Sequence, residues 1–180
     1  MRKLIAIAAI ALPLMWTACG TDKPETVEEV IPKGMVAVDL THLGHPVKIN
    51  LPDSTSGMLE SVETPGGIQL RIGNNFDILV NIGGAEETDL AKQKALIEAT
   101  DAGMSTFTVN DVTTLVWETK FGELSMFHFY SIVKVGNDTY YVRDNNLNPE
   151  NAFKKEQVDR MLESAKSLRA VAPAEAAPAS

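Results

Sequence analysis

The clearest local arrangement of residues that could do chemistry is a pair of histidines, His42 and His45, in the stretch DLTHLGH. Two imidazoles three residues apart can reach one metal ion, and Asp39 or His128 could complete the ligand set. The alternative is a solvated turn between two strands, because a glycine and a proline punctuate the stretch. The first hypothesis predicts a metal-assisted hydrolase, and the second predicts no chemistry at these positions.

Four aromatic or imidazole side chains on predicted strands could also serve a site. His128 alternates with apolar residues in LSMFHFYSIVKV. This pattern favours an interior, hydrogen-bonded histidine over a ligand or a base. Trp117, Tyr140 and Tyr141 could line a binding groove, and the alternative for them is packing in the core or across strands.

Gly83-Gly84 separates a predicted strand from a predicted helix, and such a turn can bind phosphate at the helix N-terminus. The carboxylates of Glu86, Glu87 and Asp89 follow at once, so the positive end of the helix dipole meets the chain's own charges. The stretch lacks the G-x-G-x-x-G and G-K-[ST] patterns, and the chain contains no G-x-S-x-G. We therefore expect no catalytic residues and no cofactor.

The chain begins with a positive pair, Arg2 and Lys3, and continues with an apolar run from Leu4 to Trp16. This order is typical of a secretory signal peptide. The run is shorter than the ~20 apolar residues that a membrane-spanning helix needs. We therefore expect the remainder of the protein to be exported.

Cys19 is the only cysteine in the chain, and it follows small residues at the end of the apolar run. The segment resembles the lipobox of bacterial lipoprotein precursors. The resemblance implies that residues 1–18 are removed and that Cys19 carries acyl chains, such as palmitate, that anchor the protein to a membrane. Two alternatives stay open: cleavage after Gly20, which would discard Cys19, and a cysteine without a role near the end of a signal.

Charge limits the partners that the chain can have. The formal net charge of −8 becomes −10 when the two positive charges of residues 1–18 are removed. Nucleic acid and anionic lipid both require a basic surface, so we expect neither to bind. The expected partners are the membrane, through the lipid, and a protein of the cell envelope. Gly20 differs from the Asp that retains lipoproteins in the inner membrane, which favours the outer membrane.

Composition divides the rest of the chain into three parts. Residues 19–34 are charged and contain two prolines, which predicts a flexible acidic tether. Residues 170–180 are almost entirely alanine and proline, which predicts a disordered tail. Residues 35–169 remain as a single domain, large enough to bury a core without disulfides.

Alternation of apolar and polar residues predicts eight strands in this domain. They are 35–40, 46–51, 67–73, 76–82, 106–110, 113–119, 124–135 and 138–144. The last four follow one another with short turns, which predicts an antiparallel meander. The strand 124–135 is apolar on both faces, so it belongs in the middle of a sheet that is covered on both sides.

Two helices are predicted, at 88–101 with Thr88 as N-cap and at 149–169 with Asn148 as N-cap. The second helix carries an amphipathic stripe. The residues of the stripe are Val158, Met161, Leu162, Ala165 and Leu168. Two helices and a mostly antiparallel sheet predict an α+β fold, built as a three-layer α/β/α sandwich with helices covering the sheet.

The order of these elements resembles the Mog1/PsbP-like group. The carrying features are a strand that runs into a proline (VKINLP), a Tyr-rich strand that ends the meander (DTYYVRD), and a closing helix with Val158, Met161 and Ser164. The resemblance implies the fold of residues 35–169. It also implies a non-catalytic role, because members of the group are mostly accessory or binding proteins.

The combined expectation is a lipid-anchored envelope protein that acts as a non-catalytic binding or accessory module. The alternative is a metal-assisted envelope hydrolase that uses His42 and His45.

Overall fold

The structure is a computed structural model that describes residues 30–101, 104–145 and 152–171. The chain divides into two compact units, Met1–Val30 and Ile31–Ser180. Cys19 and the predicted signal peptide lie outside the described residues, so the fold is that of the second unit. None of the described helices is long and apolar enough to cross a membrane.

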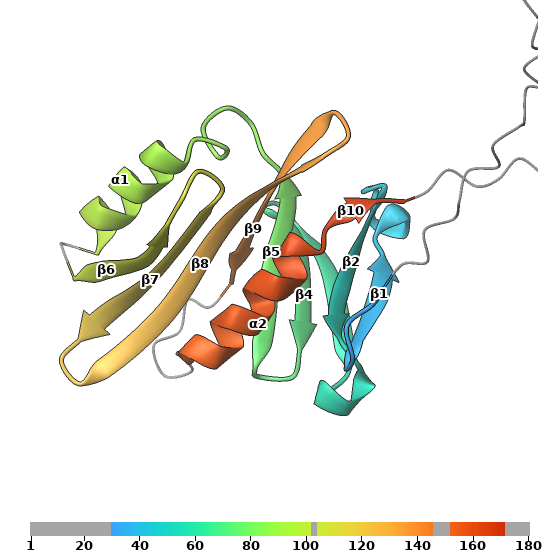
Figure 1. The fold of residues 1–180 in the computed structure, drawn as a ribbon, viewed down its shortest axis with the longest axis horizontal. Coiled ribbons are helices and arrows are strands. Elements are labelled where there is room, and N and C mark those ends of the chain that lie inside the picture. The colour runs from blue at the N-terminus through green and yellow to red at the C-terminus, as the bar shows by residue number, and fades with distance from the viewer. Residues whose placement is uncertain (1–29, 102–103, 146–151, 172–180) are drawn as a thin grey trace, which may run out of the picture. The chain divides into compact units, whose positions relative to one another are not determined.

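The main sheet has seven antiparallel strands (Figure 1). In spatial order these are β3 (Leu59–Thr64), β4 (Gly67–Ile72), β5 (Phe76–Ile82), β9 (Asp138–Asp144), β8 (Leu124–Val135), β7 (Thr114–Phe121) and β6 (Ser105–Asn110). The predicted meander from β6 to β9 is confirmed. β5 joins it by pairing with β9, with Val80 opposite Val142.

The edge strand β3 was not predicted from the sequence. Five of its six residues are exposed and two are glutamates, so its apolar alternation is weak. β3 pairs with β4 through the turn that ends at Gly67. Gly67 has a φ of 123°. A Cβ at Gly67 would lie 2.5 Å from the carbonyl oxygen of Val80, so the turn and the close approach both require glycine.

A second sheet has three strands in the order β1 (Met35–Asp39), β2 (Val47–Pro52) and β10 (Arg169–Ala170). Short 3-10 turns, η1 (Thr41–Leu43) and η2 (Ser54–Ser56), flank β2. Ala170 falls in the predicted tail, yet it pairs with Val47. The remainder of the predicted tail, 172–180, lies outside the described residues.

The strand β8 has apolar side chains on both faces, as predicted, and they enter two separate clusters. Phe129 belongs to the larger cluster, together with residues of β2, β4, β5 and the second helix. Tyr130, the next residue, belongs to the smaller cluster, together with Leu115 and Tyr141. Successive residues of a strand point to opposite faces, so the two clusters lie on opposite sides of the sheet.

The second helix, α2 (Lys155–Lys166), packs on the larger cluster. The whole predicted stripe is buried. The helix is shorter than the predicted 149–169, and Asn148 and Pro149 lie outside the described residues. It begins after the buried Phe153, whose carbonyl accepts the Phe127 N–H of β8 at 3.3 Å.

The first helix, α1 (Leu90–Thr100), begins one residue after its N-cap, Asp89. The Asp89 carboxylate accepts the N–H groups of Ala91 and Lys92 at 3.1 and 3.2 Å. Thr88, the predicted cap, instead donates its hydroxyl to the carbonyl of Gly84 at 2.7 Å. The prediction of this cap was therefore wrong by one residue.

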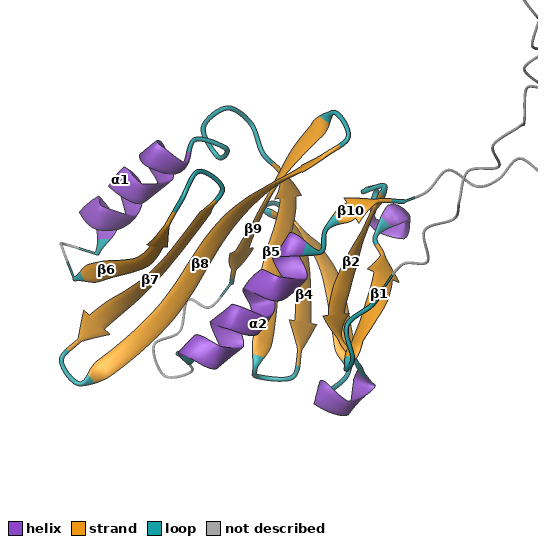
Figure 2. Cartoon of the chain, viewed as in Figure 1, coloured by secondary structure: helices purple, strands orange, loops and turns teal. Residues whose placement is uncertain are grey.

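The α+β class and the mostly antiparallel sheet are confirmed, whereas the three-layer sandwich is not supported. Leu90 and Ile97 pack against the smaller cluster, but α1 contains no fully buried residue. Each helix lies over only part of the sheet (Figure 2). The reason is that α1 lacks a strong apolar stripe, since its Leu96 is 61% exposed.

The unequal packing of the two helices leads to a stability prediction. Met161→Ala on α2 should lower the free energy of unfolding by about 2–5 kcal/mol, because it leaves a cavity in a fully buried position. Leu96→Ala on α1 should change it by less than about 0.5 kcal/mol. Urea unfolding followed by circular dichroism measures both values. Equal losses would show that α1 is packed as tightly as α2.

Candidate functional site

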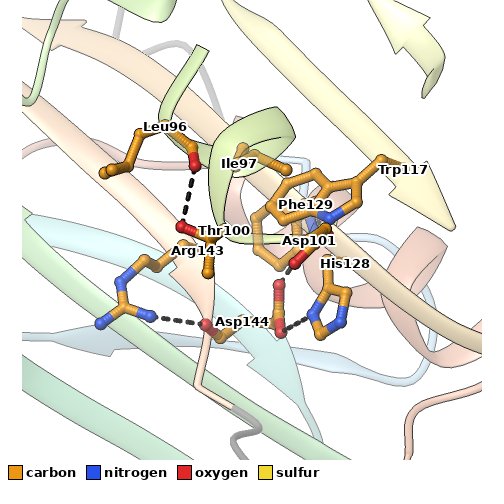
Figure 3. A pocket seen from close by; sticks show the side chains of 9 residues that line it. All are labelled: Leu96, Ile97, Thr100, Asp101, Trp117, His128, Phe129, Arg143 and Asp144. Atoms are coloured by element: carbon orange, nitrogen blue, oxygen red, sulfur yellow. Dashed lines mark hydrogen bonds and ion pairs between the residues drawn. The ribbon is translucent and has the colours of Figure 1, made fainter. Parts of the chain in front are cut away.

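A pocket of about 250 Å³ lies between α1 and the β7–β8–β9 part of the main sheet (Figure 3). The helix forms one wall with Leu96, Ile97 and Thr100. Leu96 and Thr100 are exposed, and Ile97 is half-buried. This wall is therefore mostly apolar and lies close to solvent.

Ionisable and aromatic groups line the rest of the pocket. Trp117 comes from β7, His128 from β8, and Arg143 and Asp144 from the last two positions of β9. Asp101 comes from the C-cap of α1. Side chains from four elements thus meet at one place, which is typical of a binding site.

Asp144 is held in the pocket by the way in which the sheet ends. The β8–β9 ladder pairs Tyr130 with Arg143 and then stops, while β8 continues towards Leu124. The Phe129 N–H is left without a strand partner, and Asp144 Oδ1 accepts it at 2.9 Å. A buried N–H without an acceptor would cost about 1–3 kcal/mol, so this carboxylate substitutes for the missing strand.

The second oxygen of the same carboxylate holds His128. Asp144 Oδ2 lies 2.8 Å from His128 Nδ1, and the two side chains are only 5% and 16% exposed. Since an ionised carboxylate only accepts hydrogen bonds, Nδ1 carries a proton. The imidazole also stacks on Trp117, with ring centroids 5.2 Å apart. The interior, hydrogen-bonded histidine predicted from the sequence is confirmed.

The surroundings of His128 change its pKa in two directions. Burial lowers the pKa, because it removes water from the charged imidazolium. The hydrogen bond and the negative charge of Asp144, together with the charge of Asp101, raise the pKa by more. The net pKa of His128 therefore lies above its ordinary value of about 6.5.

Asp101 joins α1 to the neighbouring strands. Its Oδ2 accepts the hydroxyl of Thr119 at 2.7 Å and also the hydroxyl of Ser105. Thr119 and Ser105 are opposite each other in the β6–β7 ladder. These contacts fix the C-terminal end of α1 beside the pocket and occupy one oxygen of the carboxylate.

Among the described residues, Arg143 is the cation of the pocket that has no carboxylate partner. The residue is half-buried, and its Nη1 donates to the backbone carbonyl of Asp144 at 3.3 Å. In the described part of the chain, no carboxylate lies within ion-pair distance of its guanidinium. Most of the guanidinium's five N–H donors are therefore available to a ligand.

The described groups of the pocket suit ligand binding. Among the described residues, the only hydrogen-bond partner of the His128 ring is Asp144. The pocket combines a stacked aromatic pair, an apolar helix wall and a guanidinium, which together suit a small ligand with apolar and polar parts.

The two histidines of the predicted metal site have different environments. His42 is exposed on η1, whereas His45 is half-buried with its ring centroid 5.8 Å from that of Tyr140. Across residues 30–101, 104–145 and 152–171, no three His, Cys, Asp or Glu side chains gather closely enough to hold a metal ion. No described geometry around this pair favours the hydrolase hypothesis.

The predicted aromatic groove residues have different environments. Tyr140 is fully buried in the larger cluster, so it packs in the core. Tyr141 stacks on Tyr130 at 5.5 Å and donates its hydroxyl to the carbonyl of Gly66 at 3.1 Å. Of the three predicted residues, only Trp117 lines the pocket. Cys19, the predicted lipid attachment point, lies outside the described residues.

The turn at Gly83-Gly84 is occupied by the chain's own carboxylate, as predicted. Glu87 Oε2 accepts the Gly84 N–H at 3.0 Å, and Asp89 accepts two N–H groups of the first turn of α1. These groups would repel a phosphate.

Sequence reasoning missed Asp101, Arg143 and Asp144 as site residues. The register of the β8–β9 hairpin could have located Arg143 and Asp144. Counting back from its turn places Arg143 opposite Tyr130, and therefore Asp144 beside Phe129 and His128. Asp101 had no such signal, because its contacts depend on where α1 lies over the sheet.

Comparisons with known proteins leave the chain without an assigned family. No protein-family model matches it, and no curated protein or solved structure matches it either. The resemblance to the Mog1/PsbP-like group therefore stays a prediction.

The environment of His128 leads to a prediction about its titration. In the wild type, NMR titration should give His128 a pKa above about 6.5. Asp144→Asn should lower the pKa below that value, because burial then outweighs the remaining charge of Asp101. Asp101→Asn serves as the control and should lower the pKa less, since Asp101 contributes the smallest effect. Equal decreases would contradict this ranking.

The same pKa predicts how stability depends on pH. The folded state binds the His128 proton more tightly than the unfolded state does. The stabilisation is complete below about pH 6.5 and is lost as the pH rises through the folded pKa. The stability difference between the wild type and His128→Gln should therefore shrink as the pH rises from about 6.5 through the folded pKa of His128. Urea unfolding at each pH measures it, and a constant difference would exclude this linkage.

Proposed function

We propose that the protein is a lipid-anchored envelope protein whose domain is a non-catalytic binding module. The pocket between α1 and β7–β9 is its binding site. The observation that carries the proposal is Arg143, a half-buried guanidinium without a carboxylate partner among the described residues, beside an apolar wall. A partly buried charge without a partner loses solvation free energy on folding, and a ligand of opposite charge can offset that loss.

The pocket's size and wall support a small ligand. A volume of about 250 Å³ lies just below the ~300–1,000 Å³ that is typical of pockets for drug-sized molecules. The wall that a ligand would contact comes from α1, which has no fully buried residue. Such a helix can shift to admit a ligand at a small cost in packing.

The anchor and the location rest on the N-terminal sequence. The signal-like segment and the position of Cys19 support acylation of its thiol and a membrane-attached protein, with the outer membrane favoured by Gly20. An acidic chain of net charge −10 after processing supports attachment through lipid rather than through a basic surface. A protein partner in the envelope, which an accessory module would need, is part of the proposal.

Globomycin, which blocks lipoprotein signal cleavage, tests the anchor. Cells treated with the drug should accumulate the uncleaved precursor, and Cys19→Ala should remain uncleaved without it. Immunoblotting and mass spectrometry of the N-terminus measure both results. Normal maturation under the drug, with an N-terminus after Gly20, would show that the alternative cleavage site is used.

A substitution that fills the pocket tests the binding site. Saturation-transfer NMR on the full chain in mild detergent would use phenol, benzamide, phenylacetate and phenethylamine as probes. At least one probe should bind with a Kd of about 0.1–10 mM, as expected for fragments of this size. Thr100→Trp should abolish the signal by filling the pocket.

Val62→Trp on β3 is the matched control, because Val62 is 53% exposed on an edge strand and does not line the pocket. This variant should bind the probes as the wild type does. Failure of every probe, or equal binding to Thr100→Trp and the wild type, would reject the pocket as the binding site.

A further inference from the structure

The charges around the pocket separate into groups that are already paired and one that is not. Asp144 is engaged by His128 and by the Phe129 N–H, and Asp101 is engaged by two hydroxyls. Arg143 has no such partner among the described residues. The group of the site that remains available to a ligand is therefore the positively charged guanidinium of Arg143, with its N–H donors.

We infer that the pocket takes a small organic monocarboxylate, whose carboxylate binds Arg143 and whose apolar body lies against Trp117 and Ile97. This inference rests on the proposed function, since it specifies the ligand of the same pocket. A planar guanidinium matches a carboxylate with two parallel hydrogen bonds.

The apolar part of the ligand follows from the opposite side of the pocket. In Figure 3, Arg143 lies on one side and the stacked rings of Trp117 and His128 lie on the other, with Ile97 above them. A ligand that reaches from the guanidinium to the rings must be charged at one end and apolar at the other. A flat ring would suit the face of the indole.

The single negative charge follows from the neighbouring carboxylates. Asp101 and Asp144 both line the pocket, and each would repel an anion. With His128 protonated, the four ionisable groups Asp101, His128, Arg143 and Asp144 sum to zero. A dianion such as a phosphate monoester would then meet two carboxylates with only one unpaired cation to balance it. A monocarboxylate requires only the one pairing that Arg143 can supply.

The test compares phenylacetate with phenylacetamide, which has the same shape and no charge. The indole N–H signal of Trp117 reports binding in ¹⁵N NMR of the full chain in mild detergent. The chain contains two tryptophans, and Trp16 belongs to the segment that the proposed processing removes, so the indole signal of the mature protein is that of Trp117. Phenylacetate should bind about 10- to 100-fold more tightly than phenylacetamide, as expected for charge-assisted hydrogen bonds.

Arg143→Gln should remove this preference by weakening phenylacetate about 10- to 100-fold while leaving phenylacetamide unchanged. Arg143→Lys should keep part of the preference, because it retains the charge and loses the paired donors. Thermal unfolding of each variant confirms that the fold is intact. Equal loss of both probes in Arg143→Gln would show that Arg143 only shapes the pocket and would overturn the inference.

Two further results separate the inference from the proposed function. If the amide binds as tightly as the acid, and Thr100→Trp abolishes both, the pocket binds ligands but the carboxylate assignment is wrong. Tighter binding of phenyl phosphate than of phenylacetate would also overturn the monocarboxylate assignment. If neither probe shifts the Trp117 signal at about 10 mM, the inference fails. The pocket itself is then judged by the wider probe set and the Thr100→Trp variant.

Discussion

The strand β8 carries apolar side chains on both faces along twelve residues, and such a strand is stable only where both faces are covered. The rest of the fold meets this constraint. β7 and β9 flank the strand, while α2 and the three-stranded sheet bury Phe129 on one face. On the other face, α1 and the aromatic rings of neighbouring strands surround Tyr130. The two clusters are separate cores that share one sheet.

The pocket is a consequence of the unequal lengths of β8 and β9. β9 ends at Asp144 while β8 extends beyond it, so the backbone N–H groups on the β9 side of β8 need other acceptors. Asp144 accepts the N–H of Phe129, and the carbonyl of Phe153 accepts that of Phe127. A carboxylate that completes a strand in this way also fixes His128. The ionisable groups of the site therefore serve the end of the sheet as well as the pocket.

The sequence predicted the parts of the fold that depend on local periodicity. The meander, the two-faced strand and the stripe on α2 are confirmed because each repeats an apolar pattern over several residues. The edge strand β3 was missed because its side chains face water. The start of α2 was wrong because Phe153 lies before the helix and bonds through its carbonyl to Phe127 of β8. The site was found only in part, through Trp117 and His128. Asp101 acts through contacts that depend on where α1 lies over the sheet, whereas the register of the β8–β9 hairpin would have placed Asp144 beside His128.

One face of the sheet provides most of the stability, and the other face holds the proposed binding site. The larger cluster, with fully buried positions such as Met161, contributes most of the hydrophobic stabilisation. The smaller cluster is closed by a helix that has no fully buried residue and whose Leu96 is exposed. Regions with few buried contacts open at a lower free-energy cost than the global core. A site on the α1 face can therefore bind a ligand without disturbing the packing of the larger cluster.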